Sequence, residues 1–109
     1  MEFIINNRPW YIKFVSAVSS NLRRSDGSLT VGVTDGNDNC VYLSDLLSGA
    51  FLKKVLCHEL CHCFMMSYNI SIPIEQEEFL ADWISIHGED LIYLLDDLMS
   101  AMSREVQYG

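Results

Sequence analysis

The pattern His-Glu-x-x-His at residues 58–62 constrains this chain more than any other stretch. Residues four apart on a helix share one face, so His58 and His62 can direct their imidazoles at a single metal ion. Glu59 is rotated by about 100° from His58 and can reach a metal-bound water without being a ligand itself. The pattern therefore predicts a helix that carries a metal site, with Glu59 as general base.

The residues around this pattern favour a long helix. Apolar side chains recur at helical spacing through residues 50–64, and no Gly or Pro lies between Gly49 and Pro73. Ser44 and Ser48 are both candidate N-caps. We expect the helix to extend from about Gly49 to Ser67, with an exit loop over residues 68–73.

Two hairpins are expected before this helix. Apolar, β-branched runs at 2–5 and 10–15 flank an Asn-Asn-Arg-Pro turn, and runs at 29–34 and 40–43 flank the polar loop 35–39. That loop is acidic, but it lacks the spacing and the closing Glu of a calcium-binding EF-hand, which favours a plain turn. These runs predict a small antiparallel sheet.

Residues 16–28 between the hairpins are polar and predict a loop. Arg23 and Arg24 concentrate positive charge in it. We favour a solvated loop, and the alternative is a contact with a substrate carboxylate or oxyanion, because loops often carry functional residues.

Two helices are expected after the helix that carries the His-Glu-x-x-His pattern. The first extends from Ile74 or Glu75 to His87 and ends at Gly88. The second begins at Glu89-Asp90 and has a helically spaced apolar stripe between Leu91 and Met102. The expected fold class is therefore α+β: one domain over residues 1–109, with a small antiparallel sheet of two hairpins packed on the active helix and two further helices behind.

A third metal ligand is expected on the helix that begins near Ile74. A catalytic zinc takes three protein ligands and leaves its fourth position to water. Glu78 and Asp82 lie four apart and share a face, so Glu78 can supply a ligand while Asp82, expected to be buried, accepts the free N–H of a ligating histidine. Glu75 and Glu77 are expected to form a solvated, acidic first turn.

Composition excludes several classes of protein. The net charge of −8, with only 7 Lys and Arg, argues against binding to nucleic acid or to anionic membrane surfaces. No apolar run is long enough for a membrane span, and the first residues lack the features of a signal peptide. The 4 cysteines are expected to be reduced thiols in a cytoplasmic protein. A structural zinc held by Cys61 or Cys63 with the histidines is the weaker alternative, since Cys61 does not share the histidine face.

The stretch His58-Glu59-Leu60-Cys61-His62, followed by Glu78-Phe79-Leu80-Ala81-Asp82, resembles the gluzincin arrangement of thermolysin-like metallopeptidases. The small size and element order are similar to those of minigluzincins and of ImmA/IrrE-type metallopeptidases, many of which are phage-associated. The resemblance implies one catalytic Zn²⁺ held by His58, His62 and Glu78. It also implies Glu59 as general base and then acid, Asp82 as the partner of His58, and a peptide or protein substrate.

The chain also departs from that family pattern. The gap between His62 and Glu78 is shorter than in thermolysin, and the C-terminal part is too small for a second lobe. The candidates for a transition-state stabiliser are His87 and Tyr93, and Tyr68 is a weaker candidate. The alternative function is therefore a metallopeptidase-like regulatory or binding protein, catalytically weak or inactive, with a structural zinc. The oligomeric state is left open.

Overall fold

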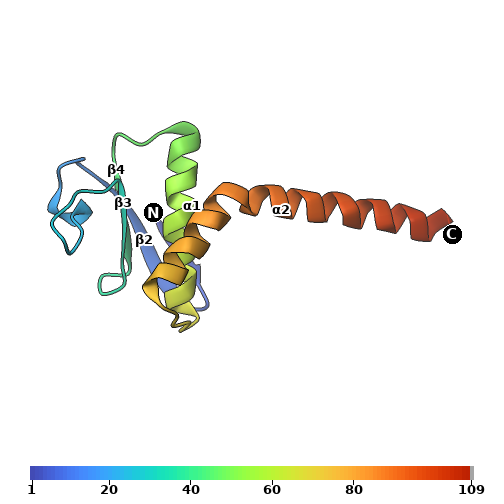
Figure 1. Cartoon of the computed structure of the whole chain (residues 1–109), viewed down its shortest axis with the longest axis horizontal. Coiled ribbons are helices and arrows are strands. Elements are labelled where there is room, and N and C mark those ends of the chain that lie inside the picture. Colours follow the sequence, from blue (N-terminus) through green and yellow to red (C-terminus); the bar gives the residue numbers. More distant parts are fainter. Residues whose placement is uncertain (109) are drawn as a thin grey trace.

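The computed structural model describes the backbone of residues 1–108 and the side chains of residues 1–104. The strands are β1 (Glu2–Ile5), β2 (Arg8–Val15), β3 (Gly32–Asp35) and β4 (Cys40–Ser44), with a 3-10 turn, η1 (Ser20–Leu22), between β2 and β3. The helices are α1 (Gly49–Ser67) and α2 (Ile74–Tyr108). Figure 1 shows α1 lying between the strands and the first part of α2, which confirms the α+β class.

The sheet has the strand order β1-β2-β4-β3 and is mixed, which corrects the expectation of a purely antiparallel sheet. Both predicted hairpins are present, because β1 pairs with β2 and β3 pairs with β4 in antiparallel fashion. Their inner strands, however, pair in parallel, with Tyr11 opposite Cys40. Val15 lies opposite Ser44 and Gly32 opposite Leu43, so the segment 16–31 joins β2 to β3 at one end of the sheet. β3 then carries the chain back, and β4 runs in the same direction as β2. The resulting order leaves β3 at an edge of the sheet.

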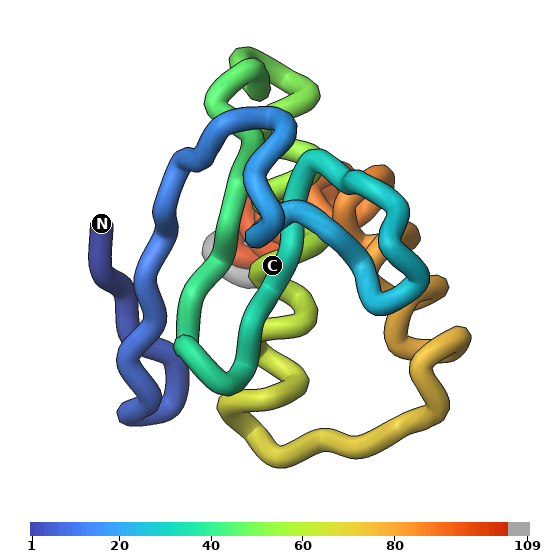
Figure 2. The backbone as a smooth tube through the Cα atoms, turned by 90° about the vertical axis from the view of Figure 1, so that its left-hand side faces the viewer, coloured from blue at the N-terminus to red at the C-terminus, as the bar shows by residue number. Residues whose placement is uncertain are grey.

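The central strand β4 is buried on both faces. Val41 and Leu43 pack with Trp10 and Val55 in the core between the sheet and α1. On the opposite face, Cys40 and Tyr42 pack against Leu22 of η1. Figure 2 looks onto the sheet and shows α1 behind the strands. The sheet therefore fixes α1 along its length, and α1 is the helix that carries the histidines.

Both ends of α1 fall where the sequence predicts them. Ser48 occupies the N-cap position, although its side chain makes no capping hydrogen bond. At the other end Asn69 takes a left-handed conformation with φ 56°. The N–H groups of Ile70 and Asn69 donate to the carbonyls of Met65 and Met66 at 2.9 and 3.2 Å, the pattern of a Schellman cap. This cap ends α1 and turns the chain toward α2.

The expectation that Gly88 ends one helix and that Glu89-Asp90 starts another is wrong, because α2 is continuous from Ile74 to Tyr108. Gly88 does not have a positive φ, so it does not adopt the left-handed conformation of a C-cap. A glycine inside a helix costs only about 1 kcal/mol relative to alanine. The helix-forming residues on both sides of Gly88 outweigh that cost.

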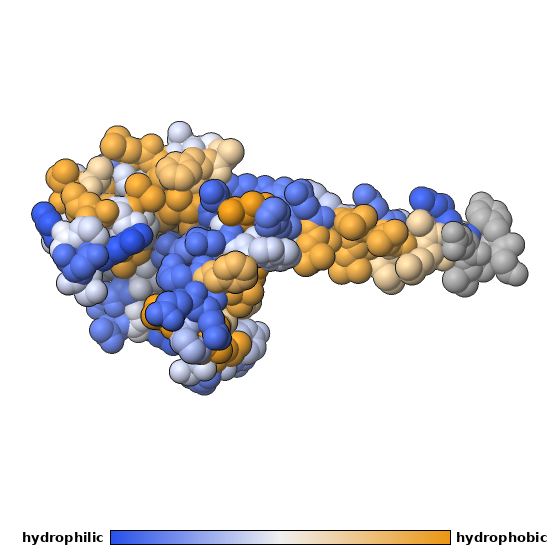
Figure 3. Space-filling model, viewed as in Figure 1, coloured by the Kyte–Doolittle hydropathy of each residue, from blue (hydrophilic) through white to orange (hydrophobic). Residues whose placement is uncertain are grey.

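The two halves of α2 have different surroundings. The first half crosses α1, whereas the second half projects beyond the rest of the molecule (Figure 1). The apolar side chains of the projecting half are about half exposed, and Figure 3 shows extensive apolar surface on this part of the helix. They are Leu91, Ile92, Tyr93, Leu94, Leu95, Leu98, Met99 and Met102. Within the described chain, no helix is both long and apolar enough to cross a membrane.

Candidate metal centre

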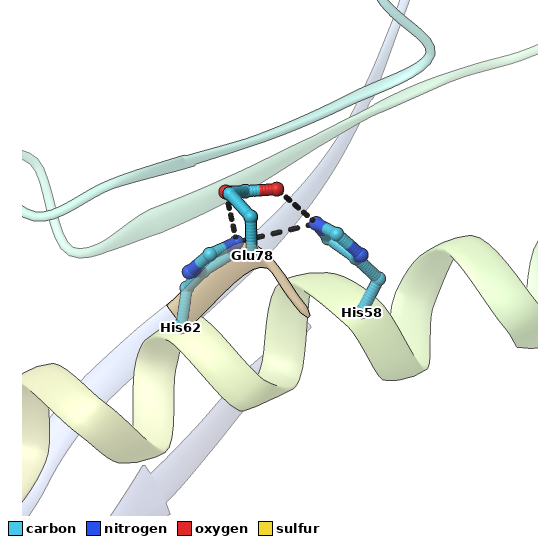
Figure 4. Close-up of side chains that lie close together, drawn as sticks. All are labelled: His58, His62 and Glu78. Carbon is cyan, nitrogen blue, oxygen red and sulfur yellow. Dashed lines mark hydrogen bonds and ion pairs between the residues drawn. The ribbon is translucent and has the colours of Figure 1, made fainter. Parts of the chain in front are cut away.

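Three side chains from two helices converge on one point. His58 and His62 rise from α1, and Glu78 reaches them from the first turns of α2 (Figure 4). The two oxygens of Glu78 lie 3.2 Å from His58 Nε2 and 2.9 Å from His62 Nε2. The two Nε2 atoms are 3.2 Å apart. The predicted cluster is therefore assembled as a group that could hold a metal ion.

Carboxylates on the far side of each imidazole orient the two rings. His58 Nδ1 lies 2.9 Å from Asp82 Oδ1, and His62 Nδ1 lies 2.9 Å from Glu77 Oε2. A neutral histidine that donates from Nδ1 leaves Nε2 as a bare acceptor. Both Nε2 atoms and the Glu78 carboxylate then present lone pairs to the same point, an arrangement that a cation stabilises. Ligand atoms about 2.1 Å from a tetrahedral zinc are separated by about 3.4 Å, close to the spacing in this cluster.

Asp82 pairs with His58 as the sequence predicts, but it does so from an exposed position. The side chain of Asp82 is 65% exposed, so the expectation that it is buried is wrong. Asp82 lies on the outer side of α2, while Ala81 is the residue that packs fully into the molecule. The carboxylate reaches inward from that surface to the imidazole.

Glu77 contacts the metal cluster, which the sequence pattern does not predict. The expectation of a solvated first turn is wrong for Glu77, because its side chain is only 15% exposed and contacts His62. Glu77 lies four residues before Ala81, which is fully buried, so it shares the packed face of α2. A glutamate on the packed face of α2 requires a partner, and His62 is that partner.

Glu77→Gln is expected to weaken metal affinity by about 10–100-fold, because an amide orients the His62 ring less strongly and makes it a poorer ligand than a carboxylate does. Competition with a coloured zinc chelator measures the change. Glu75→Gln, an exposed neighbour in the same turn, is the matched control and should leave affinity unchanged. Equal affinity in both variants would contradict the role of Glu77.

Glu59 is buried beside the cluster and is held by β3. The hydroxyl of Thr34 lies 2.9 Å from Glu59 Oε1 and 3.1 Å from the main-chain oxygen of Glu59. The other carboxylate oxygen lies 4.0 Å from His58 Nε2. Gly32 permits this close approach, because a Cβ there would lie 2.8 Å from Val55 Cγ1 and 3.2 Å from Glu59 Cγ. Glu59 thus faces the cluster without belonging to it.

The cysteines lie away from the cluster. Cys57 and Cys61 line an apolar groove between α1 and α2, and Cys63 is in the core. Burial raises the pKa of Cys61 to about 11 and that of Cys63 to about 12, so both thiols are protonated at neutral pH. The metal-ligating group found among the described residues contains no cysteine. This arrangement gives no support to the alternative of a cysteine-held zinc.

The structure does not bring the candidates for transition-state stabilisation to the cluster. His87 lies against Trp83 with ring centroids 5.4 Å apart, and Tyr68 stacks on Phe64 at 6.2 Å. Tyr93 hydrogen-bonds Glu89, which raises the pKa of its hydroxyl. In the part of the chain that the structure describes, none of these three lines the two clefts beside the cluster. The cationic residues that do line those clefts are Arg23, Arg24 and Lys54.

Comparison with known proteins finds no matching family model, curated protein or solved structure. The functional assignment therefore depends on the chain's own residues and their geometry.

Proposed function

We propose that this chain is a zinc-dependent metallopeptidase of the gluzincin type, with His58, His62 and Glu78 as ligands. The observation that carries the proposal is the convergence of three acceptor groups with Glu59 beside them. The cluster is accessible, since the Glu78 side chain is 47% exposed and clefts adjoin it. An accessible site leaves room for water and substrate, as a catalytic zinc requires.

The chain's own residues supply the remaining chemistry. Bound zinc would act as a Lewis acid that polarises the scissile carbonyl and acidifies water. Glu59 takes the proton of the attacking water and then delivers it to the leaving amine. Thr34 holds one oxygen of Glu59, which leaves the other free to act. The edge strand β3 runs beside Glu59 and offers unpaired main-chain groups to an extended peptide.

Metal content is the direct test. The native chain, purified without added metal, is expected to contain one zinc per molecule, and Glu78→Gln is expected to lose most of it. Elemental analysis measures both, with Glu75→Gln as the matched control that retains zinc. Equal zinc in the native chain and Glu78→Gln would contradict the ligand set, and no zinc in either would contradict the proposed function.

A second candidate function is a regulatory or binding protein with a structural zinc. The exposed apolar face of the projecting half of α2 favours it, because soluble domains rarely leave such a face uncovered without a partner (Figure 3). Peptide hydrolysis that depends on Glu59 would exclude a purely structural metal. A zinc-loaded chain that cleaves no peptide would favour this second function.

We also propose a reducing, cytoplasmic location. All 4 cysteines are free, including the half-buried pair Cys57 and Cys61 on α1. Free thiols persist where the cell keeps them reduced.

A further inference from the structure

One cleft beside the metal cluster is lined by cations in a chain that has few of them. The chain carries 7 Lys and Arg against 15 Asp and Glu. Arg24 and Lys54 nevertheless line the same cleft as His58 and Glu59, with Phe51 and Val55 along its wall. The N-terminal half of α1 forms that wall. Two carboxylates, those of Glu59 and Asp82, also line the cleft, so the two cations are set opposite the acidic side of the metal cluster.

The main chain fixes the position of Arg24. The Arg24 N–H donates to the carbonyl of Ser28 at 2.8 Å, and the Gly27 N–H donates to the carbonyl of Arg24 at 2.9 Å. An isolated bridge pairs Arg23 with Leu29. Arg24 Nη2 also contacts Thr30 Oγ1 at 3.3 Å. The loop between η1 and β3 is therefore a hydrogen-bonded turn that holds Arg24 at the cleft.

Neither cation in the cleft is neutralised by an ion pair. Among the side chains that the structure describes, Arg24 and Lys54 have no carboxylate oxygen within 4.0 Å. The adjacent Lys53, by contrast, pairs with Glu89 at 2.6 Å.

The carboxylates near the cleft already have other partners. Glu59 contacts Thr34, and Asp82 contacts His58. Asp26, on the same loop as Arg24, accepts hydrogen bonds from the N–H and hydroxyl of Ser28, and these bonds, with a smaller effect of the Arg24 charge, lower the pKa of Asp26. Arg24 and Lys54 therefore remain available to an anion that enters the cleft.

We propose that this cleft is a specificity pocket for a carboxylate of the peptide substrate, bound by Arg24 and Lys54. The inference rests on the proposed peptidase function. A guanidinium fork matches the two oxygens of a carboxylate, and an ammonium adds a second charge. The carboxylate belongs either to an acidic side chain near the scissile bond or to the substrate's C-terminus, and both present the same chemistry to the cleft.

Binding to the zinc-loaded Glu59→Gln chain tests this pocket without requiring cleavage. The probes are three fluorescent, alanine-rich peptides. The neutral peptide has a Gln side chain and an amidated C-terminus. The second peptide replaces this Gln by Glu, and the third keeps Gln but has a free C-terminal carboxylate. Fluorescence anisotropy gives the Kd of each. We expect one or both carboxylate peptides to bind about tenfold more tightly than the neutral one. Which of them does so identifies the source of the carboxylate.

Matched substitutions assign the preference to the cleft. Arg24→Gln and Lys54→Gln, each added to Glu59→Gln, are expected to abolish the tenfold preference. Lys53→Gln removes the same charge from the same helix outside the cleft and is expected to preserve it. Three outcomes would overturn the proposed pocket. They are equal affinity for the three peptides, no binding of any peptide, and a preference that survives both cleft substitutions. Cleavage of the neutral peptide by the native chain would still support the peptidase, so the two failures are distinguishable.

Discussion

Glu59→Gln is expected to retain zinc and to lower the rate of peptide hydrolysis by about 10²–10⁴-fold. Glutamine has nearly the shape of glutamate and can still contact the Thr34 hydroxyl, which lies 2.9 Å from Glu59 Oε1. It cannot take a proton from the attacking water. The loss therefore falls on the chemical step while the ligand cluster remains intact. Mass spectrometry of a peptide mixture incubated with the native chain and with the variant measures the rates.

The interpretation depends on two controls. Zinc content and melting temperature of Glu59→Gln should equal those of the native chain, which shows that the loss is chemical. Glu75→Gln should hydrolyse peptides at the native rate. A Glu59→Gln variant with unimpaired hydrolysis would exclude Glu59 as the general base.

Removal of the metal is expected to destabilise the folded chain strongly. A ligand at 1,000 times its Kd contributes about 4 kcal/mol to folding free energy when it binds only the folded state. Without a cation, the bare Nε2 atoms of His58 and His62 face each other at 3.2 Å beside the Glu78 carboxylate. For a domain of this size, a loss of that order lowers the melting temperature by about 10 °C or more. Thermal unfolding with zinc and with a chelator measures the difference.

Glu78→Gln separates a metal effect from a direct effect of the chelator. This variant lacks the anionic ligand, so its melting temperature should respond weakly to zinc and to chelator. Identical melting curves for the native chain with zinc and with chelator would contradict a metal site in this cluster.

Local patterns predicted much of the fold because their causes are local. The limits of α1 follow from helical periodicity and from the turn after Ser67, and the hairpin at Asn6-Asn7 follows from a turn in which both residues adopt positive φ. The parallel pairing of β2 with β4 joins segments far apart in the chain, and no short pattern encodes it. The prediction that Gly88 ends a helix is wrong because the helix-ending tendency of glycine is a weak preference that the surrounding sequence overrides.

The candidate site likewise contains residues that local spacing predicts and residues that only tertiary packing brings in. His58, Glu59 and His62 follow from the spacing on one helix, and Glu78 with Asp82 follows from the spacing on another. Thr34, Glu77 and Arg24 approach the site only through tertiary packing. Glu77 looked like a solvated acid because its sequence neighbours are acidic, whereas its helix face packs against α1. Spacing identifies ligands on one element but not the side chains that other elements bring to support them.

The parallel pairing at the centre of the sheet has a consequence for the order of folding. The two hairpins close over short loops and can form early and independently. The pairing of Tyr11 with Cys40 must close a much longer loop, which makes it the slower event. Only the joined sheet presents Val41 and Leu43 to α1 together with Trp10. All three ligands lie on α1 and α2, so a bound metal reports the docking of these two helices rather than the formation of one helix alone.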